Sequence, residues 1–212
     1  MTAGAPWPKL RRDLVAILRG LRPDEAEAVT EALASAGFEA VEVPLNSPDP
    51  FRSIERIASR FGDELLVGAG TVLEPAQVDR LRDAGGRLMV SPNVEPAVLS
   101  RAAEAGLVTL PGVFTATEAL AALRAGASAL KFFPASVLGP AGMAAIRAVL
   151  PADCVLAAVG GVSESDFPLY AAAGFRSFGL GSSLYRPGAT PAEVGERAKA
   201  AIAAYDRVFD PL

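Results

Sequence analysis

Short apolar segments rich in β-branched residues alternate along the whole chain with longer, Ala-rich amphipathic segments. The two kinds of segment have the lengths of strands and helices, and the pairs recur at a spacing of roughly 22 residues. The expected strands are Leu14–Leu18, Glu39–Val43, Leu65–Ala69, Arg87–Ser91, Leu107–Leu110, Ser128–Phe133, Cys154–Val159 and Phe175–Leu180. Serial strand–helix units of this kind form a parallel sheet covered by helices.

The amphipathic segments predict a helix after each strand. These helices are Asp24–Ala36, Pro50–Phe61, Pro75–Ala84, Glu95–Ala105, Ala116–Ala125, Gly142–Leu150, Glu164–Ala173 and Pro191–Val208. Several end on an Ala-Gly pair just before the next strand, at Gly37, Gly85, Gly106, Gly126 and Gly174. Glycine suits the left-handed cap at a helix end. Eight such units favour a closed (β/α)8 TIM barrel over an open doubly wound sheet.

No linker, composition shift or low-complexity tract interrupts this pattern. We therefore expect one barrel domain over residues 14–212, preceded by a lead-in over residues 1–13. Its Trp7 is expected to pack over one end of the fold. A chain of 212 residues is long enough for a single barrel.

Composition excludes several classes of partner. The formal net charge is −4, and no basic tract or stripe is present, which argues against nucleic acid and membrane surfaces. No apolar stretch is long enough for a membrane helix. The segment Met1–Asp13 shows no secretory signal, and the single cysteine, Cys154, allows no intrachain disulfide. These features predict a cytoplasmic protein.

The chain has no histidine. Proton transfer at any active site must then fall to carboxylates, lysine, tyrosine or water. Metal sites built on His or Cys clusters are excluded, which leaves only all-oxygen sites.

Lys131 lies in an apolar run, Ala129–Phe133, that predicts a buried strand. Of the 20 lysine and arginine residues only three are lysines, and the other two, Lys9 and Lys199, lie in the terminal segments. A lysine kept where an ammonium must leave water suggests chemistry that a guanidinium cannot perform, such as an imine with a ketone. The alternative is a stem packed along the strand with its head reaching solvent.

In such a barrel the active site lies at the carboxyl ends of the strands. Glu42 interrupts an apolar strand there, and a buried carboxylate is costly unless it is paired or functional. Without histidine it is the best candidate for proton transfer, and burial near Lys131 would perturb both pKa values. The alternative is a structural ion pair with Lys131 or Arg19.

Four further strand ends offer places for an anion. Arg19 ends the first strand, and its guanidinium suits a carboxylate or phosphate, although a rim charge with an acidic partner is the alternative. Gly70 and Thr71 could offer N–H groups and a hydroxyl. The Gly-rich turns after the last two strands, Gly160–Ser163 and Gly179–Ser183, together favour a phosphorylated substrate.

These residues belong to motifs whose order and spacing resemble one family from about Leu14 to Tyr205. The motifs are Ile17–Gly20, Val41–Asn46, Gly68–Val72, Ser91–Asn93, Leu130–Pro134, Val159–Val162 and Gly179–Ser182. The chain resembles the class I 2-keto-3-deoxy-6-phosphogluconate and 6-phosphogalactonate aldolases. The resemblance implies a trimeric (β/α)8 barrel that cleaves a phosphosugar acid through a Schiff base, with no metal or organic cofactor.

The resemblance also implies roles for individual residues. Lys131 matches the imine-forming lysine and Glu42 the catalytic acid/base. Thr71, with Gly70, matches the site of the pyruvate-derived carboxylate. The phosphate cradle is matched by Gly161, Val162, Gly181 and Ser182.

Three positions distinguish the two subgroups that the resemblance covers. The phosphogluconate enzymes carry Arg where this chain has Asn46, and they lack the Arg19 found here at the tip of the first strand. They usually carry Thr where this chain has Val159. We therefore expect 2-dehydro-3-deoxy-6-phosphogalactonate as the substrate. The alternatives are its C4 epimer or 4-hydroxy-2-oxoglutarate, and, in a different class, a non-catalytic barrel that binds a phosphate ligand.

Overall fold

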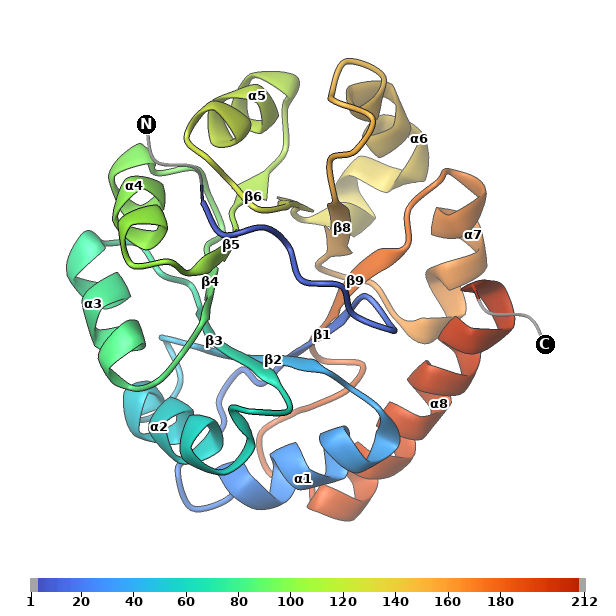
Figure 1. Cartoon of the computed structure of the whole chain (residues 1–212). Coiled ribbons are helices and arrows are strands. Elements are labelled where there is room, and N and C mark those ends of the chain that lie inside the picture. Colours follow the sequence, from blue (N-terminus) through green and yellow to red (C-terminus); the bar gives the residue numbers. More distant parts are fainter. Residues whose placement is uncertain (1–3, 210–212) are drawn as a thin grey trace.

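The computed structural model describes residues 4–209. A parallel sheet with the strand order β5-β4-β3-β2-β1-β9-β8-β7-β6 curls into a barrel, and the helices surround it (Figure 1). The strands are β1 (Leu14–Ile17), β2 (Ala40–Pro44), β3 (Leu66–Gly70), β4 (Leu88–Val90), β5 (Val108–Leu110), β6 (Gly112–Val113), β7 (Leu130–Phe132), β8 (Leu156–Val159) and β9 (Ser177–Leu180). Each expected strand is present within a few residues of its predicted bounds.

The fifth expected strand is divided into β5 and β6 at Pro111. Proline has no N–H with which to continue a hydrogen-bond ladder. β5 pairs with β4 on one side, and β6 pairs with β7 on the other. The backbone N–H groups of Ala129 and Lys131 donate to the carbonyls of Thr109 and Pro111, at 3.1 and 2.9 Å. The divided strand therefore joins both edges of the sheet, and the predicted (β/α)8 barrel is confirmed.

The helices are α1 (Ala26–Ala36), α2 (Pro50–Phe61), α3 (Pro75–Asp83), α4 (Pro96–Glu104), α5 (Ala116–Arg124), α6 (Ala135–Arg147), α7 (Phe167–Ala172) and α8 (Pro191–Phe209), with a short 3-10 turn, Glu164–Asp166, before α7. The glycines predicted to end helices all have positive φ, from 70° at Gly106 to 106° at Gly37. α6 differs from the predicted helix Gly142–Leu150 in its first residues. The helical residues from Ala135 were not predicted, and Gly139, with φ of 69° and ψ of 162°, is a non-helical kink after them. The helix that follows the kink begins close to the predicted start.

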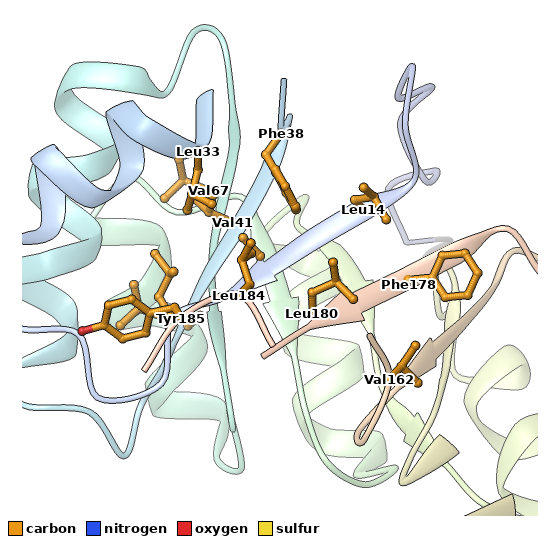
Figure 2. Packing of buried hydrophobic residues seen from close by; sticks show 14 of the residues in the cluster. Leu14, Leu33, Phe38, Val41, Val67, Val162, Phe178, Leu180, Leu184 and Tyr185 are labelled. Carbon is orange, nitrogen blue, oxygen red and sulfur yellow. The ribbon is translucent and has the colours of Figure 1, made fainter. Parts of the chain in front are cut away.

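Side chains alternate between two apolar layers because successive strand residues point to opposite faces. In β1, Leu14 and Ala16 lie in the layer between the sheet and the helices. Figure 2 shows part of this outer layer. Val15 and Ile17 instead belong to the cluster inside the barrel, where Leu66 and Leu88 also pack. A polar residue at an inward position therefore faces the barrel axis.

The lead-in crosses the end of the barrel at which the strands begin (Figure 1). Trp7 and Leu10 pack against the interior cluster, as expected for Trp7. The backbone N–H groups of Arg11 and Arg12 donate to the carboxylate of Glu39, at 2.8 and 3.2 Å. The first three residues of the predicted lead-in and the last three of the predicted barrel domain lie outside the described residues. Within residues 4–209, no helix is long and apolar enough to cross a membrane.

Candidate active site

The strand alternation turns Glu42 and Lys131 into the barrel. Val41 and Val43 of β2 lie in the outer layer, so Glu42 between them points inward. Leu130 and Phe132 of β7 likewise lie in the outer layer, so Lys131 between them also points inward. Three strands, β1, β9 and β8, separate β2 from β7 in the sheet. The carboxylate and the amine therefore face one another from opposite walls.

A cavity of about 560 Å³ opens at the carboxyl ends of the strands and includes both side chains. Of the predicted site residues, all except Gly70 and Asn46 line it. The lining comprises Ile17, Arg19, Glu42, Thr71, Lys131, Phe133, Val159, Gly160, Gly161, Val162, Gly179, Gly181, Ser182, Tyr185, Arg186 and Pro187. The barrel thus brings together residues from both halves of the chain, with apolar walls and a few polar groups, as in small-molecule sites.

Lys131 is only 6% exposed. Its Nζ lies 4.6 Å from the centre of the Phe133 ring, whose face attracts a cation. Burial nevertheless lowers the pKa of Lys131 to about 8, with the charge of Glu42 opposing this shift and that of Arg19 adding to it. At that pKa about one amine in ten is neutral at pH 7. Lys131 is thus a buried amine with access to its nucleophilic form.

Glu42 is 2% exposed, and within residues 4–209 its Oε2 has no hydrogen-bond partner. Burial raises the pKa of Glu42 to about 7, against the opposing charges of Lys131 and Arg19. A carboxyl group with a pKa near neutrality can both accept and donate a proton. Among the salt bridges of the described residues, none joins Glu42 to Lys131 or Arg19. The geometry therefore does not support the alternative of a structural ion pair.

Gly70 is the last residue of strand β3 and lies beside this carboxylate, and Thr71 follows it. A Cβ at Gly70 would overlap the Glu42 carboxylate, so Gly70 provides space for it rather than lining the cavity. Thr71 lines the cavity with a φ of 57°. This left-handed conformation is rare for a β-branched residue and is typical of strained functional positions.

Arg19 and Asn46 are joined at the rim. Nη1 of Arg19 donates a 2.6 Å hydrogen bond to Oδ1 of Asn46. Next to them, the N–H of Gly20 donates to Oγ of Ser47 at 2.9 Å, which ties the ends of the same two strands. Within residues 4–209, the partner of Arg19 is this amide, and no salt bridge joins Arg19 to an acidic side chain, as the alternative for Arg19 would require. Asn46 contacts the guanidinium rather than the cavity.

The two Gly-rich turns follow the neighbouring strands β8 and β9, and β9 in turn pairs with β1, which leads to Arg19. Gly160 and Gly161 have φ values of 92° and 71°, and a Cβ at Gly161 would overlap the Ser136 side chain. Oγ of Ser183 donates to the carbonyl of Val162 at 3.3 Å and so connects the turns. An added Cβ at Gly181 meets nothing within 4 Å, so that side of the turn is open.

Three residues that line the cavity were not predicted from the sequence, although their positions shortly after the last strand could have indicated them. Tyr185, Arg186 and Pro187 follow the last predicted turn directly, and the strand-end rule would have included them had it been extended beyond Ser183. Phe133 was part of the strand predicted around Lys131, but nothing in the pattern indicated that its ring faces the amine. Within residues 4–209, no group of His, Cys, Asp and Glu is arranged to hold a metal ion.

Residues 9–196 match the family model for KDPG and KHG aldolases. The chain belongs to this aldolase family. It is 66% identical to a probable 2-dehydro-3-deoxy-6-phosphogalactonate aldolase of Rhizobium meliloti, over 96% of each chain. It is 49% identical to the 2-dehydro-3-deoxy-6-phosphogalactonate aldolase of Escherichia coli, over 91% of this chain and 94% of the relative.

A solved structure described as native KDPGal superposes with a TM-score of 0.94 and 46% identity, covering 97% of this chain and 99% of the other. The KDPG and KHG aldolase membership confirms that the protein is an enzyme, an aldolase of the lyase class. It also excludes the prediction's alternative of a barrel without turnover. The cavity around Lys131 is the candidate site for that activity.

Proposed function

We propose that this aldolase reversibly cleaves 2-dehydro-3-deoxy-6-phospho-D-galactonate to pyruvate and D-glyceraldehyde 3-phosphate. The observation that carries the chemistry is a buried amine, Lys131, facing a buried carboxyl, Glu42, in one cavity. The two similar relatives named for the phosphogalactonate support the choice of substrate.

The reaction begins with the neutral amine of Lys131. Its lone pair adds to the C2 ketone, and loss of water from the carbinolamine leaves an iminium. The iminium accepts the electron pair of the C3–C4 bond when that bond breaks. The lowered pKa of Lys131 supports this role, because only the unprotonated amine can attack.

Glu42 is proposed as the proton-transfer group. Its carboxylate, directly or through water, takes the proton of the C4 hydroxyl as the C3–C4 bond breaks, and the aldehyde fragment leaves. The remaining enamine is protonated at C3, and water then releases pyruvate and the free lysine. A pKa of about 7 suits a group that accepts and returns a proton within one turnover.

The remaining lining residues are proposed to hold the two ends of the substrate. Arg19 and Thr71, with Gly70 behind it, bind the carboxylate next to C2. The backbone and hydroxyl groups of the cradle bind the phosphate; the cradle consists of Gly161, Val162, Gly181 and Ser182. With both ends fixed, the C4 hydroxyl is oriented toward the acid/base group.

We assign the C4 preference to Val159 and Asn46. Val159 is 3% exposed and lies on the cavity wall, where a methyl group offers no hydrogen bond to a hydroxyl of the other configuration. Asn46 contributes through Arg19, to which it is hydrogen-bonded. The phosphogluconate enzymes that the sequence resembles carry Arg at position 46 and usually Thr at position 159, so both residues distinguish this chain from them.

Two experiments test the proposal. Borohydride added with pyruvate should reduce an imine and fix a three-carbon adduct on Lys131, as read by peptide mass spectrometry. No adduct, or one on another residue, would contradict the mechanism. Initial rates on the two C4 epimers should favour the phosphogalactonate, with 4-hydroxy-2-oxoglutarate as the third substrate. A preference for either alternative would overturn the substrate assignment and leave the imine mechanism standing.

We further propose a single barrel domain behind a short lead-in, assembled as a homotrimer in the cytoplasm. Phe114 and Val137, which follow the neighbouring strands β6 and β7, are 38% and 72% exposed and offer apolar surface for an interface. Light scattering behind size-exclusion chromatography should give three times the 21.8 kDa of one chain. A mass of one or two chains would contradict the trimer.

A further inference from the structure

Arg186 is a positively charged side chain that has no role in the proposed mechanism, and it lies at the rim beside the proposed phosphate cradle. Arg186 lies between β9 and α8 and lines the cavity with Gly181 and Ser182. Its Nε donates a 2.9 Å hydrogen bond to the carbonyl of Ser182. This bond holds the guanidinium against the Gly181–Ser182 turn and does not occupy the Nη groups.

The segment that carries Arg186 is anchored on both sides. The N–H groups of Leu184 and Tyr185 both donate to the carbonyl of Gly181 at 2.9 Å. The hydroxyl of Tyr185 donates to Oε1 of Glu25 at 3.0 Å. A Cβ at Gly20 would meet the ring of Pro187 at 2.6 Å, so that ring packs against the end of β1. These contacts fix the backbone on both sides of Arg186, so its position at the cavity is defined.

The other two cationic side chains of the cavity already have proposed roles, and Arg186 has none in the proposed mechanism. Lys131 must be neutral to react, and Arg19 is committed to Asn46 and to the substrate carboxylate. In the part of the chain that the structure describes, the hydrogen bond to Ser182 is the one polar contact of the Arg186 guanidinium. A phosphate monoester brings a charge of about −1.5 to −2 and three acceptor oxygens, which backbone N–H groups alone do not neutralise.

We propose that Arg186 is the residue that makes this site select phosphorylated over unphosphorylated 2-keto acids. Its Nη groups bind two oxygens of the phosphate while the cradle binds from the other side, as a guanidinium suits a planar pair of acceptors. This inference rests on the proposed function, because it names a further binding residue for the same substrate. It identifies Arg186 as the side chain that balances the negative charge of the phosphate.

The test compares Arg186→Gln with the wild-type enzyme on the phosphorylated acid and on its dephosphorylated counterpart. The selectivity, expressed as the ratio of the two kcat/KM values, should fall by about tenfold or more, mainly through KM of the phosphorylated acid. Inorganic phosphate should inhibit the variant correspondingly more weakly. Arg186→Lys should be intermediate, because it keeps the charge and loses the paired donors.

Arg52→Gln is the matched control, since Arg52 is exposed on α2 and lies outside this cavity. An unchanged selectivity in Arg186→Gln, or equal losses on both substrates, would overturn the proposal. Failure of the wild-type enzyme to cleave the phosphorylated acid would instead refute the proposed function. Broadening of the ³¹P signal of inorganic phosphate by wild type, and its loss in Arg186→Gln, would test Arg186 in that case too.

Discussion

Nη1 of Arg19 lies 2.6 Å from Oδ1 of Asn46, and this hydrogen bond joins the tip of β1 to the loop after β2. Both side chains are exposed, yet the positive charge of Arg19, which Asn46 holds in place, acts on two buried groups. The Arg19 charge lowers the pKa of Lys131 and also lowers the pKa of Glu42. It therefore favours the neutral amine and the ionised carboxylate, which are the two forms that the proposed retro-aldol step requires.

Arg19→Gln should shift the pH dependence of catalysis. Without the Arg19 charge, the pKa of Lys131 and the pKa of Glu42 both rise, so the rising limb of kcat/KM moves to higher pH. KM should rise as well, by about tenfold, if Arg19 holds the carboxylate. Asn46→Ala should shift the limb less, in the same direction. A limb that moves to lower pH would contradict the electrostatic argument.

Glu42→Gln should lower kcat by about a hundredfold to ten-thousandfold, because it removes the proposed proton-transfer group and keeps the shape of the side chain. The Glu42 charge raises the pKa of Lys131, so this pKa falls in the variant. Trapping of pyruvate by borohydride should then extend to lower pH than in wild type, while cleavage is slow. The two readouts, measured on one preparation, separate imine formation from bond cleavage. Wild-type kcat would remove Glu42 from its role.

The buried carboxyl also predicts a pH-dependent stability. The pKa of Glu42 rises from 4.5 to about 7 on folding, so the folded state binds more protons in this interval. This contribution to the free energy of unfolding is fully present below pH 4.5 and is lost as pH rises to 7, by on the order of 3 kcal/mol. In Glu42→Gln the free energy of unfolding should not show this decrease, because glutamine has no carboxyl group to titrate. Urea unfolding at several pH values, with wild type and variant compared, measures the difference.

Lys131→Arg should lower turnover by about a thousandfold or more, although the charge is kept, because a guanidinium forms no imine. Lys199→Arg is the control, since Lys199 is exposed on α8 and contacts Glu196 at 2.8 Å. Steady-state assays on the phosphogalactonate, together with the borohydride experiment, measure the effect. Appreciable residual turnover in Lys131→Arg would count against the imine.

Gly70→Ala should displace the acid/base group. The new methyl would overlap the Glu42 carboxylate, and overpacking of a buried site costs about 1–3 kcal/mol. We expect a lower melting temperature and a lower kcat. Gly195→Ala in α8 is the control, because its methyl would meet Ala32 at an ordinary 3.5 Å. Full activity in Gly70→Ala would show that Glu42 can move without consequence.

The barrel and most of its site were predictable because they depend on local patterns. Strand and helix periods repeat throughout, and the alternation within a strand decides that Lys131 points inward while Leu130 does not. The strand-end rule then selected Arg19, Glu42 and Thr71 for one cavity, where the structure has them.

The features that could not be predicted depend on contacts between distant segments. The hydrogen bond from Arg19 to Asn46 needs the registry of two strand ends, and the space that Gly70 leaves for Glu42 needs the packing of β2 on β3. The helical residues from Ala135 to the kink at Gly139 were also missed, whereas the helix after the kink begins near its predicted start.

The lead-in covers the strand starts, where Trp7 and Leu10 pack against the interior cluster, while the cavity lies at the carboxyl ends of the strands. Substrate and products must use the same passage. In the proposed mechanism, the phosphate-bearing fragment, held at the rim, leaves while the three-carbon fragment is still bonded to the buried Lys131. Release is then ordered, with pyruvate last, and in the synthetic direction pyruvate must enter first.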